Sequence, residues 1–150
     1  MFSNVLVLCV GNVCRSPMAA AMLRQHLDAC GVRIQSAGIA ALSGAPLDPQ
    51  AQEVLQLHRV RHAHHQARQV NRELLRQADL ILLMEQSHMG EVLELAPEVR
   101  GKTFLIGKWQ PTSEVADPYR RPKSAFERTY AHLSGCIDDW LPHLQSGVTG

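Results

Sequence analysis

Apolar residues gather along the chain in short runs without polar interruption. The clearest are "NVLVLCV" at 4–10 and "DLILLM" at 79–84. Runs of this length, rich in Val, Leu and Ile and without alternation, are typical of strands buried on both faces of a parallel sheet. Two further segments, "VRIQSAG" at 32–38 and "TFLIG" at 103–107, predict a second and a fourth strand.

Helix signals stand between these runs. Ser16 before Pro17, and Asp48 before Pro49, have the order of an N-cap and a first helical residue. The first pair leads into "MAAAMLRQHLDAC", which is rich in helix formers, and Gly31 then stands where a helix would end. Other helices are predicted at 50–59, 72–77 and 87–96, and a last one whose apolar residues recur by threes and fours: Phe126, Tyr130, Leu133, Ile137 and Leu141.

Strands that alternate with helices predict parallel βαβ units with right-handed crossovers. We therefore expect an α/β fold in one domain over residues 1–150, with a doubly wound, four-stranded parallel sheet and helices on both faces. Ligands of such sheets bind at the carboxyl ends of the strands. The segment at 108–124 contains three prolines and predicts a long exposed loop of the kind that often carries function.

Composition excludes several classes of protein. The net charge of +1 gives no reason to expect nucleic acid as a partner. No apolar run approaches the roughly 20 residues that span a bilayer, and the N-terminus lacks the features of a signal peptide, so we expect a cytoplasmic protein without membrane insertion. The four cysteines form no C-x-x-C pair, which favours free thiols over a zinc ribbon.

The loop after the first strand combines a thiol and a guanidinium in the spacing C-x5-R, from Cys9 to Arg15. Backbone N–H groups of such a loop can converge on one point and bind an anion, helped by the following helix N-terminus. We expect Gly11 to adopt a positive φ and Asn12 to tolerate a left-handed conformation. Arg15 offers two N–H groups to a tetrahedral oxyanion, and Ser16 offers a hydrogen bond to the sulfur.

A thiol in this position favours its thiolate form, the nucleophile that attacks phosphorus. The alternative is a buried structural cysteine beside a solvated arginine. The chain has no G-x-x-x-x-G-K-[ST] and no G-x-G-x-x-G, so a nucleotide-binding loop is disfavoured.

The stretch at 9–17 resembles the C-x-G-N-x-C-R-S-P signature of the low-molecular-weight protein tyrosine phosphatases. Further motifs follow in that family's order: "SAG" at 36–38, "DP" at 48–49, "ARQ" at 67–69, "ME" at 84–85 and "DPY" at 117–119. The resemblance implies a metal-independent enzyme without a cofactor, which acts on phosphotyrosine proteins through a phosphocysteine.

The resemblance also implies roles for individual residues. Asp117 would be the catalytic acid and then the base, because a phenolate needs a proton as it leaves; Glu114 is the nearest rival, and a turn residue before proline is the alternative. Leu42 and Tyr119 would form the walls of the substrate pocket, and His65 would hold Asn12. The nucleophile Cys9 and Arg15 would act within a phosphate-binding loop of Val10, Gly11, Asn12, Val13, Cys14 and Ser16.

"APEVRGK" at 96–102, "GKW" at 107–109 and Leu42 resemble the bacterial branch that accompanies capsule or exopolysaccharide tyrosine kinases. That branch implies an autophosphorylating tyrosine kinase as the cognate partner. Two rivals remain at this stage. An arsenate reductase on the same fold would need relay cysteines, and 70–107 contains none. A phosphoprotein-binding module without turnover would not need all of Cys9, Arg15 and Asp117.

Other residues leave two interpretations open. Cys14 could form a reversible disulfide with Cys9 or simply pack in the loop. Arg120 and Arg121 could favour acidic sequence around the phosphotyrosine or could be solvated surface residues. A cluster of four histidines suggests a metal site, but a loop cluster without cysteine or carboxylate partners is more often incidental: His58, His62, His64 and His65.

Overall fold

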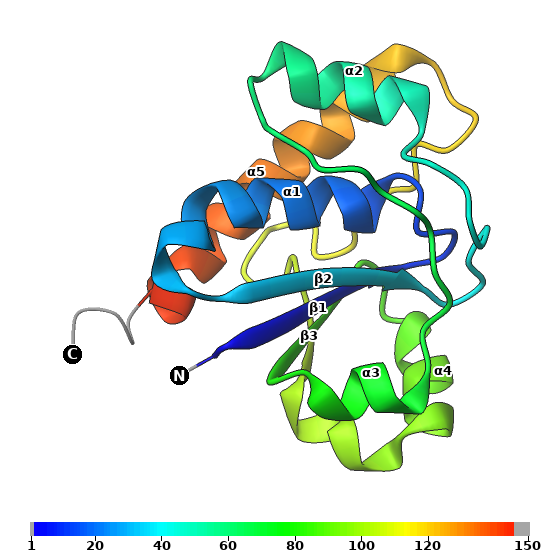
Figure 1. Ribbon diagram of the computed structural model, residues 1–150, viewed down its shortest axis with the longest axis vertical. Helices are drawn as coiled ribbons and strands as arrows, with labels where there is room; N and C mark the ends of the chain where they lie inside the picture. Colours follow the sequence, from blue (N-terminus) through cyan, green and yellow to red (C-terminus); the bar gives the residue numbers. More distant parts are fainter. Residues whose placement is uncertain (1, 146–150) are drawn as a thin grey trace.

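A parallel sheet of four strands, in the order β2-β1-β3-β4, forms the centre of the computed structural model, which describes residues 2–145 (Figure 1). Its strands are β1 (Asn4–Cys9), β2 (Arg33–Gly38), β3 (Leu80–Leu83) and β4 (Thr103–Leu105). All three neighbouring pairs are parallel. The four predicted strands are confirmed, each one or two residues shorter than its apolar run.

Helices cover both faces of this sheet (Figure 1). One face carries α1 (Arg15–Leu27), α2 (Pro49–Leu57) and α5 (Lys123–Gln145). The other face carries α3 (Arg72–Gln77) and α4 (His88–Leu95). Two 3₁₀ segments complete the path: η1 (Asp28–Cys30) after α1, and η2 (Pro97–Lys102) before β4. The doubly wound α/β architecture is therefore as predicted.

The central strand β1 supplies a core on each side of the sheet. Val5 and Val7 point toward α1, α2 and α5, whereas Leu6 and Leu8 point toward α3 and α4. All four side chains are fully buried. Burial on both faces explains why the sequence of β1 is apolar without alternation. The result is a rigid strand that ends, at the carboxyl edge of the sheet, on Cys9.

The predicted helix start at Asp48 is confirmed, whereas the one at Ser16 is wrong. Asp48 Oδ1 accepts hydrogen bonds from the amides of Gln50 and Ala51. α1 instead begins at Arg15, with Cys14 as its N-cap and no side-chain cap. Ser16 lies inside the first turn and cannot cap it, because its hydroxyl is already bound within the preceding loop.

Two glycines have clear conformational roles. Gly31 ends η1 with a φ of 73°, as expected for the residue that stops the first helix. At the end of β2, a Cβ on Gly38 would lie 2.5 Å from the carbonyl oxygen of Val10. Gly38 therefore allows β2 to approach the loop that follows β1.

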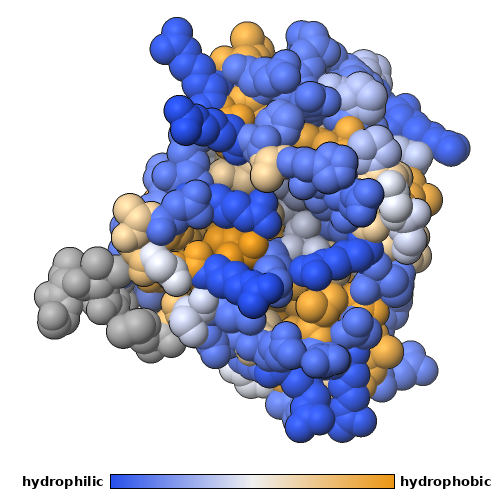
Figure 2. Space-filling view, in the orientation of Figure 1, coloured by the Kyte–Doolittle hydropathy of each residue, from blue (hydrophilic) through white to orange (hydrophobic). Residues whose placement is uncertain are grey.

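The visible face of the molecule is mostly hydrophilic, with smaller apolar patches between the charged side chains (Figure 2). Within residues 2–145, no helix has both the length and the hydrophobicity needed to cross a bilayer.

Candidate active site

The loop at 9–15 joins β1 to α1 and turns its carbonyl oxygens outward. In a trans peptide the C=O and the next N–H point in opposite directions. The N–H groups of residues 10–14 therefore face the inside of the loop and form an anion-binding nest. The outward carbonyls accept hydrogen bonds at 2.7–3.0 Å: Cys9 from Ile39 N, Val10 from Ala40 N, Gly11 from Leu42 N, Asn12 from His65 Nε2 and Val13 from Asp48 N.

Asn12 holds the turn of this loop. It is fully buried and has a φ of 60°, so the left-handed conformation expected of it is confirmed. Its Nδ2 donates to Ser16 Oγ at 2.8 Å and to Ser36 Oγ at 3.0 Å. Its Oδ1 accepts from the amide of Arg68 at 2.9 Å. The side-chain amide is thus satisfied by three separate segments, which fix the loop.

The positive φ expected of Gly11 is wrong. Only Gly31 and Gly44 have positive φ among the glycines at 2–145. The turn needs a single left-handed residue, and Asn12 supplies it with its side chain anchored. A Cβ at Gly11 would meet Leu42 Cγ at 3.6 Å, an ordinary contact at the pocket wall.

Cys9 lies at the base of the nest. Its Sγ is 2.9 Å from Ser16 Oγ, and the residue is 3% exposed. Because Asn12 Nδ2 already donates to Ser16 Oγ, the serine hydrogen can point at the sulfur, at 2.9 Å, rather than at the more distant carbonyl oxygen of Ala37, at 3.5 Å. When the sulfur is a thiolate, the serine is the only possible donor of this pair. The arrangement therefore suits a negatively charged sulfur.

Arg15 is buried beside the nest, at 1% exposure, and joins two distant segments. Its NH1 donates to Glu85 Oε2 at 2.6 Å and to the carbonyl oxygen of Val115 at 2.7 Å. Its NH2 lies 3.7 Å from Asp117 Oδ2. The guanidinium is thus held on one side and presents its charge toward the cavity.

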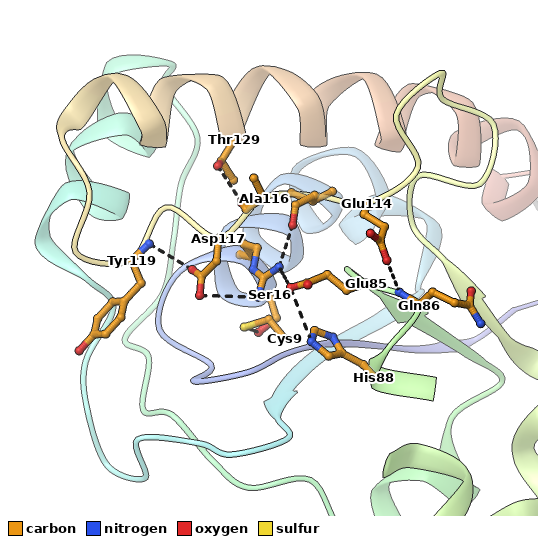
Figure 3. Close-up of polar contacts among 12 residues, drawn as sticks. Cys9, Ser16, Glu85, Gln86, His88, Glu114, Ala116, Asp117, Tyr119 and Thr129 are labelled. Carbon is orange, nitrogen blue, oxygen red and sulfur yellow. Dashed lines mark hydrogen bonds and ion pairs between the residues drawn. The ribbon is translucent and has the colours of Figure 1, made fainter. Parts of the chain in front are cut away.

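Asp117 lies on the loop between β4 and α5, and its side chain is 45% exposed. The amide of Tyr119 donates to its Oδ1 at 3.1 Å. Glu114, the rival by sequence, turns away and accepts from the amide of Gln86 at 2.7 Å (Figure 3). Of the two carboxylates, Asp117 is therefore the one that faces Arg15 and the loop of Cys9.

A cavity of about 130 Å³ opens above the loop. Leu42 and Tyr119 both line it, together with the apolar side chains of Val10, Val13 and Ala40. The walls are thus mainly apolar, while Cys9, Arg15 and Asp117 supply the polar groups. Such a pocket can take a flat apolar ring that carries a phosphoryl group. Arg120, outside it, lies over the ring of Tyr119 at 5.3 Å.

Cys14, the second thiol of the loop, also lines this cavity. Burial raises the pKa of its thiol far above the ordinary value, and the carboxylate of Asp48 adds to the effect. Cys14 is therefore a neutral thiol beside Cys9, and both cysteines are free.

Two histidines of the cluster, His58 and His65, have different partners. His65 Nε2 lies 2.7 Å from the carbonyl oxygen of Asn12, and burial lowers the pKa of its ring. The neutral ring therefore donates to this carbonyl. His58 pairs with Glu127 at 3.0 Å and stacks on Tyr130. Within 2–145, no group of three or more His, Cys, Asp or Glu side chains could hold a metal ion.

Sequence reasoning gave no role to three residues that complete the site. Ser36 and Arg68 bind the side chain of Asn12, and Glu85 binds Arg15. The sequence indicates these three residues only indirectly. They lie in "SAG", "ARQ" and "ME", three of the motifs on which the family resemblance depends.

Comparison with known proteins shows the family to which the chain belongs. The model of the family "Low molecular weight phosphotyrosine protein phosphatase" matches residues 4–149. The low molecular weight protein-tyrosine-phosphatase Etp of Escherichia coli strain K12 is 42% identical over 143 residues, which cover 95% of each protein. The tyrosine phosphatase Wzb of Escherichia coli K30, solved in complex with sulphate, superimposes with a TM-score of 0.91 at 38% identity, over 96% of this chain and 99% of that one.

Two further solved structures are informative. Wzb of Vibrio vulnificus, in complex with benzylphosphonate, has a TM-score of 0.89 at 40% identity, over 93% of this chain and 97% of that one. The YwlE arginine phosphatase of Geobacillus stearothermophilus has a TM-score of 0.87 at 32% identity, over 96% and 94%. Since the family model and these relatives cover nearly the whole chain, the protein belongs to the low molecular weight phosphotyrosine protein phosphatase family and is an enzyme of the low molecular weight protein-tyrosine-phosphatase class.

Proposed function

We propose that the protein hydrolyses phosphotyrosine in proteins through a phosphocysteine intermediate on Cys9. The observation that carries the proposal is the position of the Cys9 sulfur at the base of a nest of inward N–H groups, beside Arg15. In this scheme the amides of residues 10–15 and Arg15 hold the three equatorial oxygens of the phosphoryl group. Charge that develops on these oxygens is then stabilised by groups already in place.

Each of the two steps conserves protons and electron pairs. In the first, the Cys9 thiolate forms an S–P bond, the bond from phosphorus to the tyrosine oxygen breaks, and protonated Asp117 gives its proton to the leaving phenolate. In the second, the Asp117 carboxylate takes a proton from water. The resulting hydroxide attacks phosphorus, the S–P bond breaks, and phosphate and the thiolate are released.

The mainly apolar walls favour a phosphorylated phenol over other phosphate esters. The ring of tyrosine would lie between Leu42 and Tyr119, with its oxygen toward Asp117. The complex of Vibrio vulnificus Wzb with benzylphosphonate supports a ligand of this kind, since benzylphosphonate joins an aromatic ring to a tetrahedral phosphorus. A phosphoserine side chain lacks a ring to fill these apolar walls.

The test compares substrates in the presence of excess chelator. We expect turnover of p-nitrophenyl phosphate and of a phosphotyrosine peptide, none of a phosphoserine peptide, and none by Cys9→Ser. Because a fold relative is an arginine phosphatase, a phosphoarginine peptide belongs in the same assay. Preference for it would contradict the tyrosine assignment. Arsenate reduction with a thiol donor would favour the reductase, and phosphopeptide binding without turnover would favour the binding module.

For the physiological role, we propose that the substrates are a cognate autophosphorylating tyrosine kinase, or its targets, in the control of capsule or exopolysaccharide, and that the enzyme acts in the cytoplasm. Support comes from the 40–42% identity to Etp and Wzb and from the branch motifs at 96–102 and 107–109. The test is dephosphorylation of an autophosphorylating tyrosine kinase from the same organism. A loss of kinase phosphotyrosine with wild type but not with Cys9→Ser would support the role, and unchanged phosphotyrosine would contradict it.

A further inference from the structure

Of the two carboxylates beside the guanidinium of Arg15, Glu85 is the one within hydrogen-bond distance. NH1 donates to Glu85 Oε2 at 2.6 Å and to the carbonyl oxygen of Val115, whereas NH2 lies 3.7 Å from Asp117 Oδ2. Glu85 follows β3 directly after Met84 and is 35% exposed. A half-exposed glutamate has freedom to rotate unless a second group restrains its carboxylate.

His88 provides a group at that same oxygen. Its Nε2 lies 3.6 Å from Glu85 Oε2, and its side chain is 7% exposed (Figure 3). The amide of His88 also donates to the carbonyl oxygen of Glu85 at 3.1 Å. The turn from 85 to 88, at the start of α4, therefore sets the imidazole against the carboxylate. Arg15 and His88 contact one oxygen from two directions.

The other nitrogen of this ring assigns the tautomer. His88 Nδ1 is buried and has no hydrogen-bond partner within 2–145. A hydrogen on Nδ1 would be a buried N–H without an acceptor, which costs more free energy than a nitrogen lone pair without a donor. We therefore place the hydrogen on Nε2, which faces Glu85. Burial lowers the pKa of His88, as does Arg15, while the carboxylates of Glu85, Glu91 and Glu114 oppose the shift. The ring is neutral at pH 7.

We propose that His88 is a positioning residue: its Nε2–H, 3.6 Å from Glu85 Oε2, attracts the carboxylate electrostatically from beyond hydrogen-bond distance, keeps it toward Arg15 and so fixes the guanidinium at the phosphate site. The inference rests on the proposed function of that site. When the ring gains a proton in acid, the cation competes with Arg15 for the same oxygen. The hold of Glu85 on Arg15 then weakens, and catalysis declines on the acid side.

Two substitutions separate positioning from packing. In His88→Gln the amide nitrogen reaches the place of Nε2, donates to Glu85 and does not titrate. In His88→Asn the amide ends near the place of Nδ1 and leaves Glu85 without this donor. We expect His88→Gln to keep kcat/KM within about threefold, and His88→Asn to lose roughly tenfold to a hundredfold because Arg15 is misplaced. Urea unfolding of both variants shows whether each is folded.

The pH profile gives a second readout, because a packing role would not move it. Wild type should show a steeper acid-side decline in kcat/KM than either variant, measured with p-nitrophenyl phosphate and corrected for the ionisation of the substrate. Equal kcat/KM for the two variants, or an unchanged acid limb, would overturn the proposal.

A third measurement does not need activity. The ring resonances of His88, followed by NMR against pH, should titrate at lower pH in Glu85→Gln than in wild type, because a carboxylate that favours the charged ring is lost. An unchanged titration would overturn the proposal. Since the NMR measurement works on an inactive protein, failure of the positioning role is distinguishable from failure of the phosphatase function.

Discussion

The guanidinium of Arg15 lies 3.7 Å, from NH2 to Oδ2, from the carboxylate of Asp117. The same guanidinium donates to the carbonyl oxygen of Val115, on the loop that carries Asp117. One side chain from the start of α1 therefore ties the loop of Asp117 to the loop of Cys9. The geometry of both chemical steps depends on this contact.

Replacing Arg15 by lysine should remove this connection although the charge remains. The planar guanidinium can donate to Glu85, to the carbonyl oxygen of Val115 and to a phosphoryl oxygen at once. The single side-chain nitrogen of lysine cannot reach all three. We expect kcat/KM for p-nitrophenyl phosphate to fall by at least about 10²-fold. The segment at 112–121 should also exchange its amides faster with deuterium. Arg72→Lys, at an exposed ion pair on α3, is the control and should have no effect on either. Wild-type turnover in Arg15→Lys would contradict the account.

Replacing Asp117 by asparagine should make the rate depend on the leaving group. The amide cannot supply a proton, and phenyl phosphate must then expel a strongly basic phenolate. We expect a loss of about 10²–10³-fold on phenyl phosphate and a clearly smaller loss on p-nitrophenyl phosphate. The matched control is Glu114→Gln, whose carboxylate faces Gln86 and should not change this ratio. Equal losses on both esters would remove Asp117 from the acid role.

Two substitutions at Asn12 should separate its backbone role from its hydrogen bonds. Asn12→Gly keeps the left-handed conformation but removes the three side-chain hydrogen bonds, which should lower the free energy of unfolding by roughly 1–3 kcal/mol. Asn12→Ala also strains the backbone at φ 60° and should be less stable than Asn12→Gly by about 1 kcal/mol. Urea unfolding measures both. If alanine were as stable as glycine, the left-handed turn would not be a requirement.

His65 should make the stability of the fold depend on pH. Because burial lowers its pKa in the folded state below the ordinary 6.5, the unfolded chain binds a proton first as the pH falls. The contribution of His65 to the free energy of unfolding is therefore fully present above pH 6.5 and is lost as the pH falls toward its folded-state pKa. We expect His65→Gln to lose less stability than wild type when the pH falls from 7.5 to 5.5. These two pH values lie about one pH unit above and below the ordinary pKa of 6.5. His62→Gln is the control, and an equal loss in wild type and His65→Gln would contradict the assignment.

The sequence predicted strands and helix starts correctly where neighbouring residues alone determine the local structure. The runs of β1 and β3 are apolar on both faces because both faces are covered, and Asp48 caps α2 through its own amide neighbours. The prediction at Ser16 was wrong for a physical reason. Its hydroxyl binds Cys9 and Asn12, and no local pattern reveals that competition.

The candidate site was foreseeable in part. Cys9 and Arg15 were visible because strand, loop and helix start are contiguous in sequence. The left-handed turn was assigned to both Gly11 and Asn12, and only the anchored side chain of Asn12 shows which residue takes it. Glu85, from beyond β3, accepts a hydrogen bond from Arg15, and His88 lies 3.6 Å from the same carboxylate. Such contacts depend on how the strands are arranged in the sheet, so the spacing of residues along the sequence does not predict them.

The most direct test of the account is to locate the phosphoryl group during turnover. Asp117→Asn with p-nitrophenyl phosphate should form the intermediate readily, because the leaving group needs little acid, and hydrolyse it slowly, because the base is absent. Acid quenching followed by peptide mass spectrometry should then find one phosphoryl group on Cys9, and none in Cys9→Ser. A phosphoryl group on another residue, or turnover by Cys9→Ser at the wild-type rate, would contradict the mechanism.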